Sequence, residues 1–368
     1  MNVTRSKLFT SFEPSQTGGV NLYVLTEKTA PLQQSFYFVN SGWSQDARYL
    51  WFYCAFPPSG RTLGVADIQE ETVHHFPDTQ FQDASPFVDP MTGTAYWTSG
   101  TSIWCRPPDP SAEPQWVNSL PEDIVKNRKT SKLATHLTRS ADGREFFVDA
   151  AVGLQIIFGS LPVDGGDFQF WARFDRNSNH AQFSPEDPDL VLFAQENHHD
   201  PITGLKFGIT DRMWLIRRGE QAQPVFSQPT KVTHEWWDAD GQNVWCVREN
   251  EAWKTNISTE SVEKIQNPVH CWHAHTNRNG DFLVFDSHGQ RPFRRGAPSS
   301  VYFLNRHTGK NVKIVDNPEM PGISGSNYHI DPHPRFCCQD ELIAFTTTIR
   351  GEVDVAFVKT SELINITS

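Results

Sequence analysis

The stretch HLTRSADGREFFVDA occupies residues 136–150 and combines a short extended run, a turn containing Asp and Gly, and a strongly apolar strand. The apolar part is rich in aromatic and β-branched residues, which is typical of β-strands. The same pattern occurs seven times in the chain, as GWSQDARYLWFYC (42–54), PFVDPMTGTAYWT (86–98), HLTRSADGREFFVDA (136–150), HAQFSPEDPDLVLFA (180–194), THEWWDADGQNVWCV (233–247), HAHTNRNGDFLVFDS (273–287) and HPRFCCQDELIAFTT (333–347). Equivalent positions of successive copies are 39 to 60 residues apart.

Four short antiparallel strands fill a repeat of this length, so the seven copies predict an all-β, seven-bladed β-propeller in a single domain over residues 1–368. The strand-like segment VNLYVLTE (20–27) precedes the first repeat, and the last repeat ends near Val358, soon after its third strand. Because an open ring leaves exposed sheet edges, we expect the amino-terminal strand to complete the last blade. Helical periodicity is nearly absent, with residues 121–133 as the only plausible helix, which disfavours a parallel α/β fold. Six or eight blades remain possible, since the second copy is weak.

Composition limits the partners and the compartment. The net charge is −11, with 32 basic and 43 acidic residues, which argues against nucleic acid and against an anionic membrane surface as partners. The six cysteines lack zinc-binding spacing, and most lie in apolar runs, as reduced core cysteines do. The first 17 residues lack the apolar core of a secretory signal, and no apolar run approaches the length of a membrane span. We therefore expect a soluble cytoplasmic protein.

The repeat alignment places histidines at one position of most blades. Its seven residues are Asn40, Ala84, His136, His180, His234, His273 and His333. The first strand of each propeller blade lies beside the central axis, so these five histidines, here called the axial histidines, should lie at one height around it. Side chains two residues apart on a strand share a face, which adds His275, Arg335 and Asp331 to the same neighbourhood.

A single histidine in a buried strand is ordinarily a hydrogen-bonded core residue, and a repeated one can simply brace the sheets. Here the histidines accompany Arg335 and Asp331 at the axis, where side chains face a channel and unpaired polar groups are costly. The set as a whole therefore favours a functional site. His and Asp around one open position suit a first-row divalent ion such as manganese, and zinc less well. Arg212 and His234 add a fixed cation and a titratable base from neighbouring blades.

Several segments resemble the oligogalacturonate lyase family. HAQFSPEDPDLVLFAQE (180–196), followed by DRMWLI (211–216), resembles the fourth-blade signature of that family. THEWWDADG (233–241) is similar to its Gly-His-Glu-aromatic segment, and DPHPRF (331–336) is similar to its His-Pro-His-Pro-Ser-Phe segment before the last blade. In organisation the resemblance extends over residues 20–359, whereas the specific motifs lie within residues 179–336.

The resemblance implies a seven-bladed propeller that cleaves short uronate chains by β-elimination, with a manganese ion bound by histidines and a glutamine. Carried over to this chain, His234 matches the base, Arg212 matches an arginine of the site, and His273 and His333 match the first and last metal histidines. Two positions depart from the family, with Asp331 in place of another histidine and Tyr328 in place of the glutamine. An Asp still binds manganese, so the metal is retained while the ligand set changes.

The predicted function is that of a lyase acting on uronic-acid-containing oligosaccharides by metal-assisted β-elimination, which yields a 4,5-unsaturated uronate. The predicted cofactor is a divalent metal, Mn²⁺ by the resemblance, and the predicted partner is an acidic oligosaccharide. The candidate residues are His234, Arg212 and His180 for catalysis, His136, Arg335 and His275 for substrate binding, and His273, His333 and Asp331 for the metal. A non-catalytic propeller that serves as a protein-interaction or carbohydrate-binding scaffold is the alternative. A glycoside hydrolase needs two facing carboxylates, and Asp331 and Glu235 give no clear pair.

Overall fold

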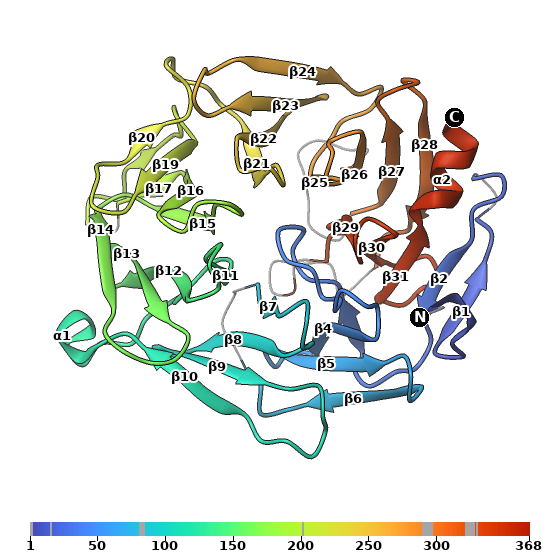
Figure 1. Cartoon of the computed structure of the whole chain (residues 1–368), viewed down its shortest axis with the longest axis horizontal. Helices are drawn as coiled ribbons and strands as arrows, with labels where there is room; N and C mark the ends of the chain where they lie inside the picture. The colour runs from blue at the N-terminus through green and yellow to red at the C-terminus, as the bar shows by residue number, and fades with distance from the viewer. Residues whose placement is uncertain are drawn as a thin grey trace.

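Seven sheets of four or five strands surround a central axis (Figure 1). The computed structural model describes residues 3–14, 17–80, 85–200, 202–288, 297–320, 328 and 330–368. The predicted all-β, seven-bladed β-propeller is confirmed, and six or eight blades are ruled out. Of the aligned positions, Ala84 lies outside the described residues.

Each blade is an antiparallel meander whose strands follow one another from the axis outward. Blade one consists of β3 (Leu32–Gln34), β4 (Tyr49–Ala55), β5 (Arg61–Asp67) and β6 (Thr72–Phe76). Blade two consists of β7 (Phe87–Val88), β8 (Ala95–Ser99), β9 (Ser102–Arg106) and β10 (Gln115–Ser119). Blade three consists of β11 (Thr138–Arg139), β12 (Glu145–Val152), β13 (Gln155–Pro162) and β14 (Gln169–Phe174). Blade four consists of β15 (Ser178–Phe183), β16 (Leu190–Gln195), β19 (Met213–Arg217) and β20 (Gln223–Pro224). Blade five consists of β21 (Thr233–Trp237), β22 (Asn243–Arg248), β23 (Glu251–Asn256) and β24 (Val262–Gln266). Blade six is β25 (Ala274–Thr276), β26 (Phe282–His288), β27 (Ser299–Asn305) and β28 (Asn311–Asn317). A small hairpin of β17 (His198–His199) and β18 (Lys206–Phe207) extends from blade four.

The two chain ends share the seventh blade. It consists of β29 (Arg335–Cys337), β30 (Leu342–Thr347), β31 (Asp354–Lys359), β2 (Leu22–Leu25) and β1 (Phe9–Phe12). Strand β2 pairs antiparallel with β31, with Leu22 opposite Val358 and Val24 opposite Ala356. The prediction that the amino-terminal strand completes the last blade is therefore confirmed, and β1 adds a fifth strand outside it.

Buried apolar clusters lie between neighbouring blades. Trp51 of blade one packs with Trp97 of blade two, and Phe147 of blade three packs with Phe193 of blade four. Similar clusters lie at the other five blade junctions. The abundant aromatic residues of the sequence are thus the large side chains that fill the space between twisted sheets.

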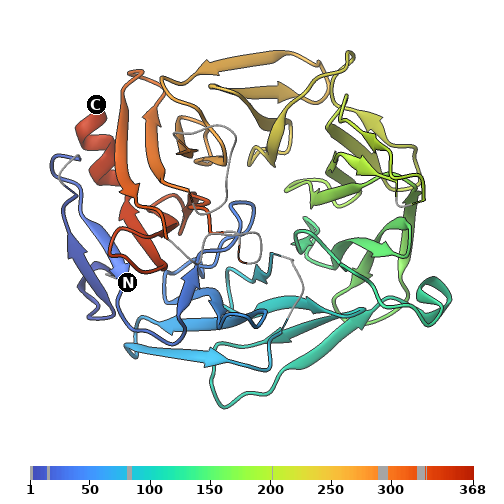
Figure 2. The same cartoon turned by 180° about the vertical axis from the view of Figure 1, so that it is seen from behind.

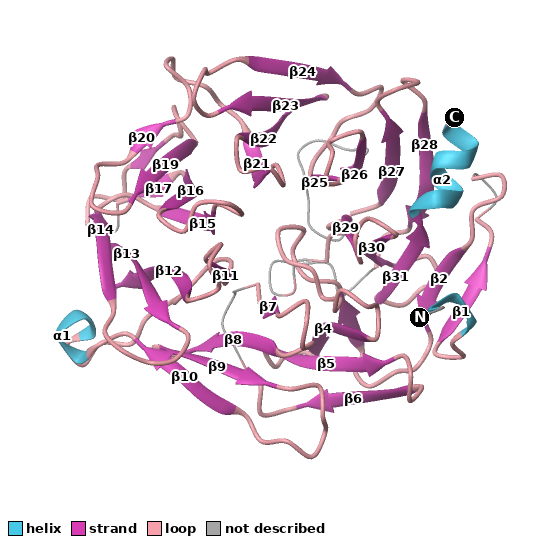
Figure 3. Cartoon of the chain, viewed as in Figure 1, coloured by secondary structure: helices cyan, strands magenta, loops and turns pink. Residues whose placement is uncertain are grey.

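Helices are short and lie at the periphery (Figure 3). The 3-10 helix η1 (Val3–Arg5) precedes β1, and α1 (Glu122–Val125) lies within the stretch predicted as a possible helix. Helix α2 (Thr360–Thr367) was not predicted. It forms because Leu363, which is fully buried, packs against blades six and seven, and its last turn accepts a hydrogen bond from the side chain of Asn305.

The connection between β3 and β4 enters the centre of the ring, where it is visible from both sides (Figures 1 and 2). Tyr37, Phe38 and Val39, here called the axial plug, lie on this connection. Phe38 is 1% exposed and packs with Trp236 of blade five. The guanidinium of Arg335 donates hydrogen bonds to the carbonyl oxygens of Phe38, at 2.6 Å, and of Val39. The plug is therefore a fixed part of the core.

Ring closure makes a direct prediction for Val24. It is fully buried in β2, between β1 and β31, so a proline there removes a ladder hydrogen bond on one side or the other. We expect Val24→Pro to lower the free energy of unfolding by at least about 1–3 kcal/mol, the cost of one orphaned buried backbone group. Urea denaturation followed by circular dichroism measures this.

The matched control is Val262→Pro at the first residue of β24, the outermost strand of blade five, where Val262 is 37% exposed. A proline is tolerated at such a position, so this variant should remain close to wild type. Equal stability of the two proline variants would contradict the role of β2 in ring closure.

Candidate active site

The axial histidines come together at the amino-terminal ends of the innermost strands. The ring centroids of His273 and His333 are 4.2 Å apart, those of His234 and His273 are 4.4 Å apart, and those of His136 and His180 are 4.8 Å apart. Histidines separated by up to 197 residues in the sequence therefore form one cluster, as the repeat alignment predicts.

Tyr37 of the axial plug lies among these rings. Its ring centroid is 4.8 Å from those of His136 and His333, 5.6 Å from that of His273 and 5.9 Å from that of His180. Desolvation raises the pKa of Tyr37 well above its ordinary value, and the nearby carboxylate of Glu235 raises it further. The phenol is therefore protonated at every pH at which the protein is expected to work.

Three axial histidines have an unusual backbone. The φ angles of His180, His234 and His333 are 56°, 52° and 46°, in the left-handed region that residues with a side chain rarely adopt. The pairing of β15 and of β21 with their neighbours shifts at His180 and His234, as in a β-bulge. Each such residue costs about 1–2 kcal/mol, and this kind of strain concentrates at functional sites, where bulges redirect side chains.

A possible metal site lies on one side of Tyr37. Ligand atoms of His273, Asp331 and His333 all lie within 4.8 Å of one another, and all three side chains are buried. Asp286 of β26 contacts both histidines of this cluster. Its carboxylate lies 2.9 Å from Nδ1 of His273, and it accepts the backbone N–H groups of His273 at 2.8 Å and His333 at 3.3 Å.

This arrangement fits a divalent ion. A carboxylate on Nδ1 of a histidine keeps the proton on that nitrogen and leaves Nε2 as the metal-binding atom. Two imidazoles and one carboxylate suit a first-row divalent ion. His288 adds a fourth polar side chain beside the cluster, with its Nε2 3.8 Å from the carboxylate of Asp331.

Arg212 lies on the opposite side of Tyr37 and is already matched by two carboxylates. Its Nε donates to Glu235 at 2.8 Å, and its Nη1 donates to Glu196. Burial alone would lower the pKa of Arg212, but Glu235 and Glu196 together raise it above its ordinary value. His180 lies 3.9 Å from each of these carboxylates. Arg212 is thus a permanent cation whose charge is compensated inside the protein.

His180 and His136 form a neutral pair. Nε2 of His136 lies 3.0 Å from Nδ1 of His180. Burial, with help from the cations Lys132 and Arg212, lowers the pKa of His136 to about 3. Burial and the neighbouring His136 and Arg212 also hold the pKa of His180 well below its ordinary value. Both imidazoles are therefore uncharged at neutral pH.

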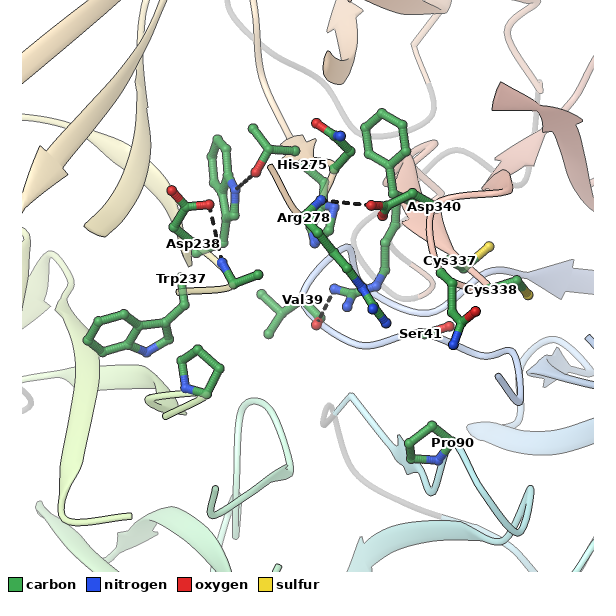
Figure 4. A pocket seen from close by; sticks show the side chains of 18 of the residues that line it. Val39, Ser41, Pro90, Trp237, Asp238, His275, Arg278, Cys337, Cys338 and Asp340 are labelled. Atoms are coloured by element: carbon green, nitrogen blue, oxygen red, sulfur yellow. Dashed lines mark hydrogen bonds between the residues drawn. The ribbon is translucent and has the colours of Figure 1, made fainter. Parts of the chain in front are cut away.

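Two predicted residues lie elsewhere. His275 and Arg335 line a separate cavity, which lies at the carboxyl ends of the innermost strands (Figure 4). They are two residues beyond His273 and His333, which corresponds to about 7 Å along an extended strand. The structure brings seven of the nine predicted site residues to the axial histidines and leaves these two beyond the axial plug.

Comparison with known proteins shows which proteins the chain resembles. It is 24% identical over 202 residues to an oligogalacturonide lyase of Pectobacterium atrosepticum and 23% identical over 204 residues to an oligogalacturonate lyase of Dickeya dadantii, in each case covering 50% of both chains. The chain thus spans about half the length of the curated relatives it matches. A solved oligogalacturonate lyase in complex with manganese superposes with a TM-score of 0.76 at 16% identity, over 96% of this chain and 97% of that one. The chain is a divergent relative of the oligogalacturonate lyases. No family model matches it.

Several residues of this candidate site were not predicted from the sequence. Asp286 follows four apolar residues in the strand FLVFDSH, and Asp149 follows three in EFFVDAAV. Asp149 accepts the backbone N–H of Thr135 at 2.6 Å, next to His136. An acidic residue within the apolar second strand of a blade was therefore the feature of the sequence that could have predicted the roles of Asp286 and Asp149. Trp272, 4.7 Å from His234 between ring centroids, and Tyr37 carried no repeat-based signal.

The support of His273 by Asp286 predicts a change in metal affinity. Asp286→Asn removes the carboxylate that fixes the His273 tautomer, so we expect the affinity for Mn²⁺ to fall about 10- to 100-fold, as is usual for such supporting groups. Titration calorimetry with the metal-stripped protein measures it. Asp149→Asn is the matched control, because Asp149 supports the neighbourhood of His136 instead, and its Mn²⁺ affinity should be unchanged.

The depressed pKa of His136 predicts acid sensitivity. Because the unfolded chain binds a proton near pH 6.5 and the folded chain only near pH 3, His136 contributes stability above pH 6.5 that is lost as the pH falls toward 3. His136→Gln should reduce the slope of unfolding free energy against pH in that window by up to about 1.4 kcal/mol per pH unit. The exposed His199→Gln control should keep the wild-type slope, and an unchanged slope in His136→Gln would contradict the assignment.

Proposed function

We propose that this protein is a lyase that cleaves uronic-acid-containing oligosaccharides by metal-assisted β-elimination and yields a 4,5-unsaturated uronate. The observation that carries the proposal is the buried cluster of His273, Asp331 and His333, supported by Asp286 and bordered by His234. The names of the relatives support the same reaction class and an acidic oligosaccharide as substrate. In the part of the chain that is described, no helix has the length and apolar character to cross a bilayer.

His273, His333 and Asp331 would hold the divalent ion, which we infer to be Mn²⁺ because a similar fold is known as a manganese complex. When bound, such an ion stabilises the negative charge that develops on a uronate carboxylate as the neighbouring C5 proton leaves. Asp331 adds a negative charge to the ligand set, which favours an ion that accepts oxygen donors.

His234 is the proposed base. It lies next to His273, between Trp272 and Phe38, and is not one of the three clustered ligands. Its imidazole takes the C5 proton, the electron pair of that C–H bond forms the C4–C5 double bond, and the C4–O bond breaks. The departing oxygen takes up a proton. The bulged, left-handed backbone at His234 supports this role, because such bulges redirect side chains at functional sites.

His180, His136 and Arg212 are proposed to position the sugar on the other side of Tyr37. One N–H of this neutral pair is used between the two rings, which leaves one N–H to donate to a hydroxyl or to the departing oxygen. Arg212 holds Glu196 and Glu235 in place beside His180. Since both carboxylates bind Arg212, they do not suit the acid and base pair of a hydrolase, which supports elimination over hydrolysis.

Activity tests the proposal directly. A panel of galacturonate- and glucuronate-containing oligosaccharides is incubated with the Mn²⁺-loaded protein, and the ultraviolet absorbance of the 4,5-unsaturated product is recorded. Absence of this absorbance with every member of the panel, together with no bound metal, would favour the non-catalytic scaffold instead.

The role of His234 gives a sharper test. His234→Ala should lower turnover about 10²- to 10⁴-fold, the usual contribution of a general base, while the protein keeps its fold and its Mn²⁺. Turnover, circular dichroism and metal content are measured on the same preparation. The control His307→Ala removes a histidine whose side chain is 65% exposed, and it should behave as wild type. A folded, metal-loaded His234→Ala protein within a few-fold of wild-type turnover would exclude His234 as the base.

A further inference from the structure

The cavity beyond the axial plug is a second candidate binding site. It has a volume of about 380 Å³ and lies at the carboxyl ends of the innermost strands, where Gln182, Trp237, His275 and Arg335 line it (Figure 4). Val39 of the axial plug also lines it, whereas Tyr37 contacts the axial histidines. The plug therefore lies between the two sites, so a ligand in this cavity does not contact His273 or His333.

Arg335 is a partly buried cation that forms no ion pair with a carboxylate of the described residues. It donates hydrogen bonds to the carbonyl oxygens of Phe38 and Val39. Its guanidinium stays charged at neutral pH, as arginine does in proteins. Arg212, by contrast, binds two carboxylates. Because buried charges are ordinarily paired, a cation facing a cavity is a place for an anionic group of a ligand.

The rest of the cavity suits a sugar ring. The indole N–H of Trp237 donates to the carbonyl of Gln182 at 3.1 Å, which fixes the ring at the cavity wall, where it offers an apolar face. Side-chain amides of Gln45 and Asn277 can form hydrogen bonds with hydroxyls. The imidazole of His275 also lines the cavity and can donate or accept a hydrogen bond there.

The acidic side chains of the wall do not oppose an anion strongly. Asp238 is paired with Lys254 at 2.6 Å. Asp340 accepts the backbone N–H of Arg278 at 2.9 Å, while the guanidinium of Arg278 is solvent-exposed and makes no ion pair within the described part of the chain. Asp340 is attracted electrostatically to both Arg335 and Arg278 but forms an ion pair with neither. Two arginines therefore face one carboxylate in this cavity, which favours a single carboxylate on the ligand.

We propose that this cavity binds an acidic monosaccharide, or the acidic end of a short saccharide, with the sugar carboxylate on Arg335 and the ring against Trp237. The site is separate from the proposed elimination site and needs neither the metal nor His234. Binding and catalysis can therefore fail independently of each other.

Binding is measured by calorimetry and by tryptophan fluorescence with metal-stripped protein. Galacturonate is the probe, galactose supplies the same ring without the carboxylate, and acetate supplies the carboxylate without the ring. We expect galacturonate to bind at least 10-fold more tightly than either. Equal binding of acetate would reduce the cavity to a small-anion site, equal binding of galactose would remove the role of Arg335, and no binding of galacturonate would overturn the proposal.

Variants locate the bound sugar. Arg335→Gln should weaken galacturonate binding roughly 10- to 100-fold, as expected when a charged hydrogen bond is lost, whereas Arg144→Gln at an exposed arginine should not. Since Arg335 also holds the plug, Trp237→Leu and Arg278→Gln provide rim variants that do not touch Phe38 or Val39, and each should weaken binding several-fold. His234→Ala and His273→Ala should leave binding unchanged. Wild-type affinity in both rim variants, or lost affinity in the two histidine variants, would overturn the proposal.

Discussion

The pairing of β2 with β31 is the contact on which the rest of the structure depends. Each blade is a small sheet with two edges, and the ring leaves no open edge at its junction only because the first strands of the chain complete the last blade. Once closed, the ring directs every innermost strand toward one axis. Residues that are far apart in the sequence, such as His136 and His333, then both contact Tyr37 because they occupy equivalent positions on those strands.

A ring of this kind brings polar side chains into a buried space, where unpaired polar groups are costly. Carboxylates in the second strand of two blades reduce this cost by accepting hydrogen bonds from the backbone at or next to these side chains. Asp286 in β26 accepts the backbone N–H of His273, and Asp149 in β12 accepts that of Thr135, one residue before His136. The same device therefore holds two axial histidines through the peptide backbone. In the sixth blade the carboxylate also contacts the imidazole itself, so it would leave Nε2 of His273 as the nitrogen for the proposed metal ion.

Most of the fold follows from the sequence because the repeat is a physical unit: a turn followed by an apolar strand has one way to pack in each blade. The elements that the sequence did not predict lack such a repeat. Helix α2 contains three β-branched residues among its last four, which isolated helices disfavour, and it is helical because Leu363 is buried against blades six and seven. The axial plug interrupts the pattern of the first blade, and its position depends on contacts with Trp236 and Arg335 from distant blades.

The sequence predicted which residues of the innermost strands face the axis, but not their positions along it. Alternation along a strand predicts which face a side chain occupies, so it groups His273 with His275 and His333 with Arg335. It does not tell how deep along the axis a contact lies, and two residues are enough to move a side chain by about 7 Å. The axial plug lies between those two depths, so the same strands contribute to two different environments. Imidazole and carboxylate side chains surround Tyr37, whereas Arg335, which forms no ion pair with the described residues, lies beyond Val39. A division of one channel into two sites therefore requires only the three residues that cross it.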